Sequence, residues 1–176
     1  MRTQSILLWG GLAAAVGLYL YSRTQSGQAA VAYVADAVGN LLTPRGIRNN
    51  NPGNVERTTI QWQGSIPADQ VQAVLGVAYD PVYEQMYTPA DGVRMIGHVL
   101  KAKAGRGLTT VNAIIRNYSS TDQDAYVANV ADALGVDPLQ PLEVSAVLPA
   151  FAVAIIQQEN GQQPYQLSDI ATWVYS

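Results

Sequence analysis

The stretch from Ala150 to Tyr165 constrains the fold more than any other part of this 176-residue chain. It reads AFAVAIIQQENGQQPY, so an apolar run leads through two glutamines to Glu159. If this run is helical, the helix is apolar on every side and has to be buried. Asn160-Gly161 then predicts the end of the helix. We therefore predict a buried helix with a single carboxylate at its C-terminal end.

The predicted position of Glu159 suits a proton donor. Apolar burial disfavours the charged form of a carboxyl group, and the partial negative charge at a helix C-terminus acts in the same direction. A carboxyl group in such surroundings can keep its proton near neutral pH and give it to a substrate. The alternative is a solvated glutamate on the last turn of a helix.

The composition excludes several kinds of site. Hydrophobic residues make up 48% of the chain and charged residues only 13%, about half the usual charged share. With a net charge of -3 and scattered Lys and Arg residues, there is no basic stripe, and nucleic acid is not expected as a partner. The absence of cysteine excludes thiolate chemistry and cysteine metal sites. The single histidine, His98, cannot form a histidine metal cluster, and its helical pattern predicts that it points to solvent.

The N-terminal part of the chain has the pattern of a membrane segment. Residues 6–21 read ILLWGGLAAAVGLYLY without a charge, between Arg2 and Arg23. At about 1.5 Å per residue this stretch crosses most of a hydrocarbon core. We predict a transmembrane anchor over residues 1–23, and a cleaved signal peptide is the alternative. Residues 24–43 are predicted to form a linker and an amphipathic segment ahead of a domain at 44–176.

An asparagine-rich stretch opens this domain. Residues 45–55 read RGIRNNNPGNV, and because Asn competes for its own backbone while Pro-Gly sets a turn, the stretch predicts a loop. Amide side chains both donate and accept hydrogen bonds, as recognition of sugar hydroxyl and acetamido groups requires. The alternative is a surface loop with a purely structural role.

The next segment carries aromatic residues and one more acid. Residues 60–64, 78–79 and 82–87 are predicted to be short strands or extended loops. Trp62 and Tyr87 fit either sugar platforms or core residues. Glu84 alternates with apolar Tyr83, so we predict it on a solvent face, where it is a possible second catalytic carboxylate.

Helical patterns follow from Pro89 onward. We predict helices over 90–103, over 111–118, and from a capping box at residues 121–124 to Gly135. A further helix contains Pro149, which either kinks it or starts a new helix at Ala150. The sequence thus predicts a mainly helical domain with a small extended or β part.

Several of these motifs occur together in a known group of proteins. The stretches 45–55 (RGIRNNNPGNV), 62–64 (WQG), 88–94 (TPADGVR) and 155–165 (IIQQENGQQPY) occur in this order in a group of phage-encoded proteins, which this chain resembles over about residues 45 to 170. That group is similar to the lysozyme-like superfamily of muramidases and lytic transglycosylases. The resemblance implies a mainly α, α+β lysozyme-like domain after the transmembrane helix.

The glutamate motif carries the resemblance to the catalytic site. Soluble lytic transglycosylases have their catalytic Glu at the end of a buried helix, followed by Ser-Gly and a nearby proline. Glu159-Asn160-Gly161 with Pro164 is similar, except that Asn replaces Ser. The motif lies near the C-terminus, whereas the glutamate helix usually comes first, so the resemblance implies a rearranged chain order.

The resemblance implies a reaction. Glu159 would protonate the glycosidic oxygen between N-acetylmuramic acid and N-acetylglucosamine, and the muramyl 6-hydroxyl would then attack C1. One carboxylate suffices for this, whereas glycosidases usually use two. Asn49, Asn50, Asn54 and Tyr165 are the candidate substrate-binding residues, and no metal or cofactor is needed.

The implied partners are bacterial peptidoglycan, a lipid bilayer through residues 6–21, and other virion membrane or capsid proteins. The implied localisation is the virion membrane, or the host inner membrane before assembly, with local opening of the cell wall during entry as the use. The alternatives are a hydrolytic muramidase and an inactive lysozyme-like structural or peptidoglycan-binding membrane protein of the virion.

Overall fold

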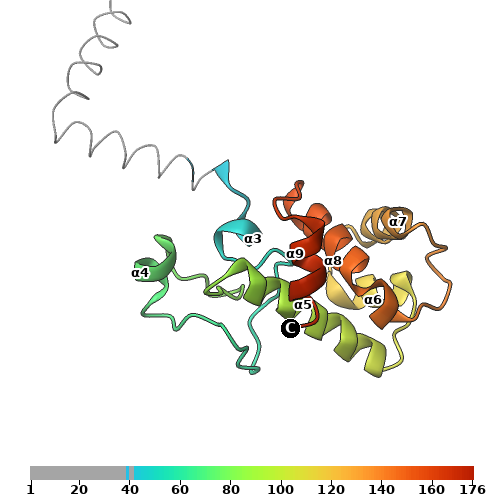
Figure 1. Ribbon diagram of the computed structural model, residues 1–176, viewed down its shortest axis with the longest axis horizontal. Helices are drawn as coiled ribbons and strands as arrows, with labels where there is room; N and C mark the ends of the chain where they lie inside the picture. Colours follow the sequence, from blue (N-terminus) through green and yellow to red (C-terminus); the bar gives the residue numbers. More distant parts are fainter. Residues whose placement is uncertain (1–38, 40–41) are drawn as a thin grey trace, which may run out of the picture. The chain divides into compact units, whose positions relative to one another are not determined.

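The structure is a computed structural model that describes Gly39 and residues 42–176 (Figure 1). Pro44–Ser176 form one compact unit. The helices of this unit follow one another along the chain as α3 (Arg45–Arg48), α4 (Val71–Leu75), α5 (Pro89–Gly105), α6 (Val111–Tyr118), α7 (Gln123–Leu134), α8 (Val144–Asn160) and α9 (Leu167–Trp173).

Helix α8 is the centre of the core. It packs against α3, α5, α7 and α9, and Figure 1 shows it near the middle of the unit, between α9 and α7. Phe151, Ile155 and Ile156 are completely buried, and each such side chain stabilises the fold by about 1.5–3 kcal/mol. Pro149 lies inside a continuous helix. The predicted buried helix is confirmed.

The predicted spans of three helices are confirmed, but one predicted helix cap is wrong. Helices α5, α6 and α7 confirm the predicted spans, and Gly135 ends α7 with a φ of 66°. The predicted capping box at residues 121–124 is wrong, because Asp122 has a φ of 42° and its side chain makes no capping hydrogen bond. A side chain reaches the first free N–H groups from an extended N-cap residue. Thr88 is extended and forms a capping box with Asp91 at the start of α5.

The predicted fold class is wrong about its β part. Among the described residues no strand forms, and the expected strand region has only two isolated antiparallel bridges, Glu56 with Tyr83 and Ser65 with Met86. The physical reason is that the backbone of this region is paired with the asparagine-rich loop. Met86 N donates to Asn49 O at 2.9 Å, and Asn51 Nδ2 donates to Glu84 O at 3.0 Å. Further pairing of this segment with residues 64–66, through Ile66 N to Gln85 O and Tyr87 N to Gly64 O, is confined to one isolated bridge.

The membrane part of the prediction is also corrected. No helix in the described part of the chain is long and apolar enough to cross a membrane. The longest, α5 and α8, have 17 residues each, against about 20 for a membrane-spanning helix. The predicted transmembrane helix at residues 6–21 lies outside the described residues. On this finding the predicted fold class with a transmembrane helix and the membrane-anchored localisation are withdrawn.

Candidate active site

Glu159 lies on the last turn of α8, where Gly161 ends the helix with a φ of 67°. Its side chain is half-buried. It lines a cleft of about 630 Å³, whose other walls come from the loop at 54–62, from α5 and from the segment 116–123. The buried helix thus places the carboxyl group in the wall of this cleft.

Both oxygens of the Glu159 carboxyl group accept a hydrogen bond. Asn54 Nδ2 donates to Oε2 at 2.9 Å, and the Tyr126 hydroxyl donates to Oε1 at 2.9 Å. The two donors come from different elements, the asparagine-rich loop and α7. Because a carboxyl group offers about four acceptor positions, the two donors fix its orientation and leave a position on each oxygen for a substrate.

Two buried tyrosines support this arrangement. Burial raises the pKa of Tyr126, and neighbouring Tyr118 and Glu159 raise it further. Burial also raises the pKa of Tyr118 well above its ordinary value, and Glu159 adds to this effect. Both side chains therefore remain hydrogen-bond donors through the neutral and moderately alkaline range, and the Tyr118 hydroxyl donates to Gly53 O at 2.6 Å.

The role of Tyr126 was missed in the sequence, where it reads as one apolar position on the buried face of a helix. Only 4% of its surface is exposed. The available signal was its hydroxyl group, because a buried tyrosine usually finds a hydrogen-bond partner.

The loop that carries Asn54 is held against α8 at close range. Asn160 Nδ2 donates to Pro52 O at 2.7 Å and to Ile156 O at 2.9 Å. A β-carbon on Gly53 would lie 2.5 Å from the Tyr118 hydroxyl oxygen, so only glycine allows this approach. Asn54 itself has a φ of 47°, a left-handed conformation that asparagine tolerates better than most residues.

The other two predicted asparagines are not brought to Glu159. Asn49 is buried, donates to Asp80 Oδ2 at 3.1 Å and accepts from Gln85 Nε2 at 3.2 Å. Asn50 donates to the carbonyl groups of Met86 and Tyr87, at 3.1 Å each. The described wall of the cleft does not include them. Their role in substrate binding stays a prediction.

Tyr165 makes no hydrogen bond to the Glu159 carboxyl group in the described part of the chain. Its ring makes an edge contact with Trp173, with 5.9 Å between the ring centroids. Burial raises the pKa of Tyr165, and its hydroxyl oxygen has no hydrogen-bond partner among the described residues. Tyr165 is not among the described residues that line the cleft.

The predicted candidate for a second catalytic carboxylate, Glu84, is buried outside the described cleft wall, and a different acid, Glu56, lines the cleft. Glu84 was predicted on a solvent face, which is wrong, because only 4% of it is exposed. It forms an ion pair with Arg57 Nη1 at 3.0 Å and accepts a hydrogen bond from Ser65 Oγ at 3.0 Å. Glu56, by contrast, is exposed and lines the same cleft as Glu159. Sequence reasoning missed Glu56.

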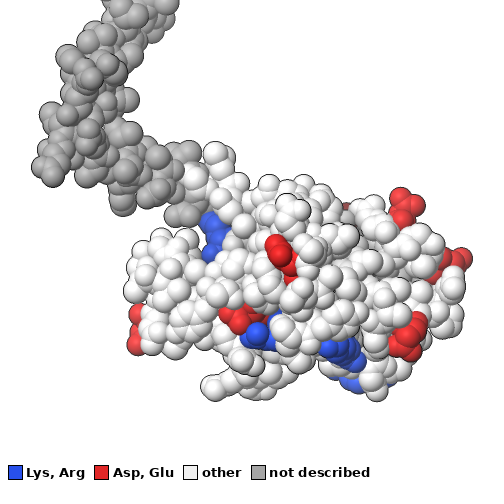
Figure 2. Space-filling model, in the orientation of Figure 1, with Lys and Arg blue, Asp and Glu red and all other residues white. Residues whose placement is uncertain are grey.

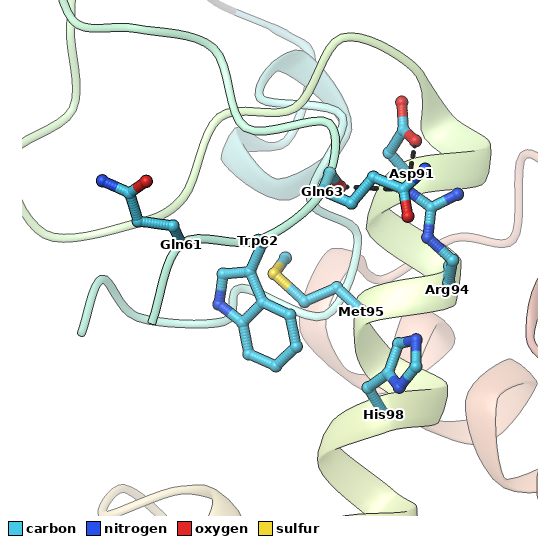
Figure 3. A pocket seen from close by; sticks show the side chains of 7 residues that line it. All are labelled: Gln61, Trp62, Gln63, Asp91, Arg94, Met95 and His98. Carbon is cyan, nitrogen blue, oxygen red and sulfur yellow. Dashed lines mark hydrogen bonds and ion pairs between the residues drawn. The ribbon is translucent and has the colours of Figure 1, made fainter. Parts of the chain in front are cut away.

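A smaller pocket of about 150 Å³ adjoins the cleft, and Trp62 lines both. Figure 3 shows Trp62 close to Met95 of α5, with His98 further along the same helix. Arg94 Nη2 donates to Gln63 O at 2.9 Å and so ties this loop to α5. Trp62 is half-buried, and its Nε1 has no hydrogen-bond partner among the described residues.

His98 is exposed, as predicted. Partial burial, followed by the positive charges of Lys101 and Arg94, lowers its pKa. Its ring centroid lies 6.3 Å from that of Trp62. It therefore lies in the rim of the smaller pocket as a mainly neutral side chain at neutral pH.

The charges of the unit are sparse. Figure 2 shows mostly white surface on the visible face, with basic and acidic side chains in small separate groups. Among the described residues no group of three or more His, Cys, Asp or Glu side chains is placed to hold a metal ion.

The fold and the site together define a helical protein with a carboxyl group held by two donors in a polar cleft. No family model matches the chain. The chain is 32% identical over 133 residues to Protein P5 of Pseudoalteromonas phage PM2, a match that covers 72% of this chain and 77% of that protein. This chain belongs to the same family as Protein P5.

Proposed function

We propose that this chain is a virion-associated phage lytic transglycosylase that cleaves bacterial peptidoglycan with Glu159 as its single catalytic acid and base. The observation that carries the proposal is the placement of Glu159 at the end of a buried helix, in a cleft, with Asn54 and Tyr126 each donating to one of its oxygens at 2.9 Å. The relationship to a phage protein supports the viral setting. Opening the cell wall locally during entry is the proposed use.

In the proposed reaction, Glu159 gives its proton to the glycosidic oxygen as the bond between that oxygen and C1 of N-acetylmuramic acid breaks. The muramyl 6-hydroxyl attacks C1, and its proton returns to the Glu159 carboxylate, so the enzyme is restored and a 1,6-anhydro ring is formed. Asn54 and Tyr126 keep the carboxyl group in one orientation through both steps. Such positioning is a large part of general acid-base catalysis.

The test is Glu159→Gln, assayed on purified peptidoglycan. Glutamine keeps the size of the side chain and still accepts a hydrogen bond, but it cannot donate the proton. Removal of a general acid costs about a hundred- to ten-thousand-fold in rate, so the variant should be folded and almost inactive. Asp132→Asn is the matched control, because Asp132 is an exposed carboxylate on α7. Wild-type rates in Glu159→Gln would refute the proposal.

A hydrolytic muramidase is the second candidate, and Glu56 favours it. Hydrolysis usually needs a second carboxylate to act as nucleophile or to activate water, and Glu56 lines the same cleft. The mass of the products separates the two reactions, because an anhydromuramyl end is lighter by one water than a reducing end. Glu56→Gln should leave transglycosylation nearly unchanged and should abolish hydrolysis.

A structural or peptidoglycan-binding role is the remaining alternative. In that case the wild-type protein would bind peptidoglycan without releasing soluble fragments, and Glu159→Gln would behave as the wild type does. Release of soluble fragments by the wild type, but not by Glu159→Gln, supports the enzyme.

A further inference from the structure

A buried lysine without a carboxylate partner lies in the wall of the cleft. Only 6% of Lys103 on α5 is exposed. Its Nζ donates to Asn117 O at 2.7 Å and to Asn117 Oδ1 at 2.8 Å. The ion pairs found among the described residues are formed by other side chains. The positive charge is therefore hydrogen-bonded but not neutralised.

Such a charge is costly to bury. Desolvation is offset when a buried charge has an opposite charge beside it. Here burial lowers the pKa of Lys103, and the positive charge of Arg106 acts in the same direction. An ammonium group has three N–H donors, of which Asn117 accepts two. Among the described residues the third donor has no hydrogen-bond acceptor and the ammonium group has no counter-charge, although it also faces the Tyr118 ring.

Lys103 is close to the catalytic end of the cleft. Its Nζ lies 5.6 Å from the centroid of the Tyr118 ring, and the Tyr118 hydroxyl donates to Gly53 O, next to Asn54. Tyr118 thus contacts Lys103 through its ring and, through its hydroxyl group, the loop whose Asn54 donates to Glu159.

The other basic side chains of the cleft differ in whether a neighbouring side chain already contacts their charged group. Arg116 is paired with Asp124, and the Arg45 guanidinium stacks on the Tyr83 ring at 3.6 Å. Arg106 is exposed at the end of α5, in the same wall as Lys103. The acids of the described cleft wall are Glu56 and Glu159, against four Lys and Arg residues.

We propose that Lys103 and Arg106 form an anion subsite that binds a carboxylate of the muramyl unit, so that the cleft selects the acidic glycan of peptidoglycan over a neutral N-acetylglucosamine polymer. The inference rests on the proposed function for the identity of the glycan. The carboxylate has two possible sources. One is the peptide stem, and the other is the lactyl group of the sugar, whose carboxyl group is free only where the stem has been removed, because the stem is attached to it through an amide bond.

The experiment measures binding of the full chain to three insoluble probes: intact peptidoglycan sacculi, strands stripped of their peptides by an amidase, and chitin. The wild type should bind sacculi about tenfold more tightly than chitin. Lys103→Met should lower affinity for sacculi about tenfold or more, as expected for a hydrogen bond to a charged group. Arg106→Gln should lower it about two- to fivefold, as expected for an exposed charge. Neither change should alter binding to chitin.

Two further variants make the comparison specific. Lys103→Arg keeps the charge and should retain most of the preference for sacculi. Lys101→Gln removes an exposed charge from the same helix, outside the described cleft wall, and should bind as the wild type does. If Lys103→Met does not fold, Arg106→Gln still tests the subsite, because its side chain is exposed. The effect of Arg106→Gln should shrink at about 1 M salt, where exposed charges are screened within about 3 Å.

Equal affinity of the wild type for sacculi and chitin, or wild-type preference in both charge-removing variants, would overturn the subsite. A loss of binding on sacculi alone assigns the anion to the peptide stem, and a loss on stripped strands as well shows that the subsite also accepts the lactyl carboxylate that the amidase frees. Binding is measured apart from cleavage. A protein that prefers the acidic glycans but releases no fragments retains the subsite and loses the proposed enzyme.

Discussion

Replacing Gly46 by alanine tests how the asparagine-rich loop is fitted to α8. An ideal β-carbon at this position would lie 2.6 Å from Asn160 Oδ1, 2.9 Å from Asn51 O and 3.1 Å from Asn54 Oδ1. Carbon and oxygen atoms in favourable contact are about 3.3–3.6 Å apart. Asn160 cannot turn aside cheaply, because its amide donates to Pro52 O and Ile156 O.

The magnitude follows from two opposing effects. Inserting a methyl group into a well-packed interior costs about 1–3 kcal/mol, and we take the upper part of this range, about 2–3 kcal/mol, because the new β-carbon would lie within 3.1 Å of three oxygen atoms. Alanine is better than glycine in a helix by about 1 kcal/mol, and Gly46 lies in the short helix α3. We therefore expect Gly46→Ala to lower the free energy of unfolding by about 1–2 kcal/mol. For a domain of this size that corresponds to a fall in Tm of roughly 3–8 °C.

Gly105→Ala is the matched control. Gly105 is the last residue of α5, and a β-carbon there would meet nothing within 4 Å. This substitution should raise the free energy of unfolding by about 0.4–1 kcal/mol. Thermal unfolding followed by circular dichroism measures both variants, and the two shifts in Tm should have opposite signs.

The same substitution also tests the site. Because the new methyl group would press on Asn54 Oδ1, the Asn54 side chain should shift away from Glu159, and Gly46→Ala should lose peptidoglycan-cleaving activity at temperatures where it is still folded. Gly105→Ala should keep full activity. A Gly46→Ala protein as stable and as active as the wild type would refute this account of the loop.

Two other predictions concern single side chains near the loop. Tyr126→Phe keeps the buried ring but removes the donor to Glu159 Oε1, so the cleavage rate should fall about tenfold or more, as for a hydrogen bond to a charged group. The far-ultraviolet circular dichroism spectrum should stay unchanged. A wild-type rate would show that this donor is dispensable. Burial alone would raise the pKa of Asp80, but hydrogen bonds from the Tyr83 and Val82 N–H groups and from Asn49, with the charge of Arg45, bring the pKa below the ordinary value of 3.8. Its ionised form therefore stabilises the fold above about pH 4, and that contribution is lost as the pH falls through the lower folded-state pKa. Thermal unfolding of Asp80→Asn should show a deficit in Tm at pH 6 that narrows below pH 4, and a deficit independent of pH would contradict the sign of this shift.

The sequence by itself determined the core helix and its end. The run from Ala150 to Ile156 is apolar on every side, so burial was the only way to remove it from water, and Asn160-Gly161 had to end the helix. The spans of α5 and α6 followed in the same way from the spacing of apolar residues. These are local properties, because helical periodicity and glycine stops act within a few residues.

Only the tertiary structure decided which polar side chains form the site. The hydrogen bond from Asn54 to Glu159 joins residues 105 positions apart, and that from Tyr126 joins residues 33 positions apart. Asn49, Asn50 and Asn54 have the same amide group, so composition could not separate the one that contacts the carboxyl group from the two that hold the loop together. Glu84, predicted on a solvent face, is buried in an ion pair with Arg57, while Glu56, which the sequence analysis did not single out, lines the cleft. The sequence gives the chemical group of each side chain, but the partners of that group depend on which distant segments the packed core brings within hydrogen-bond distance.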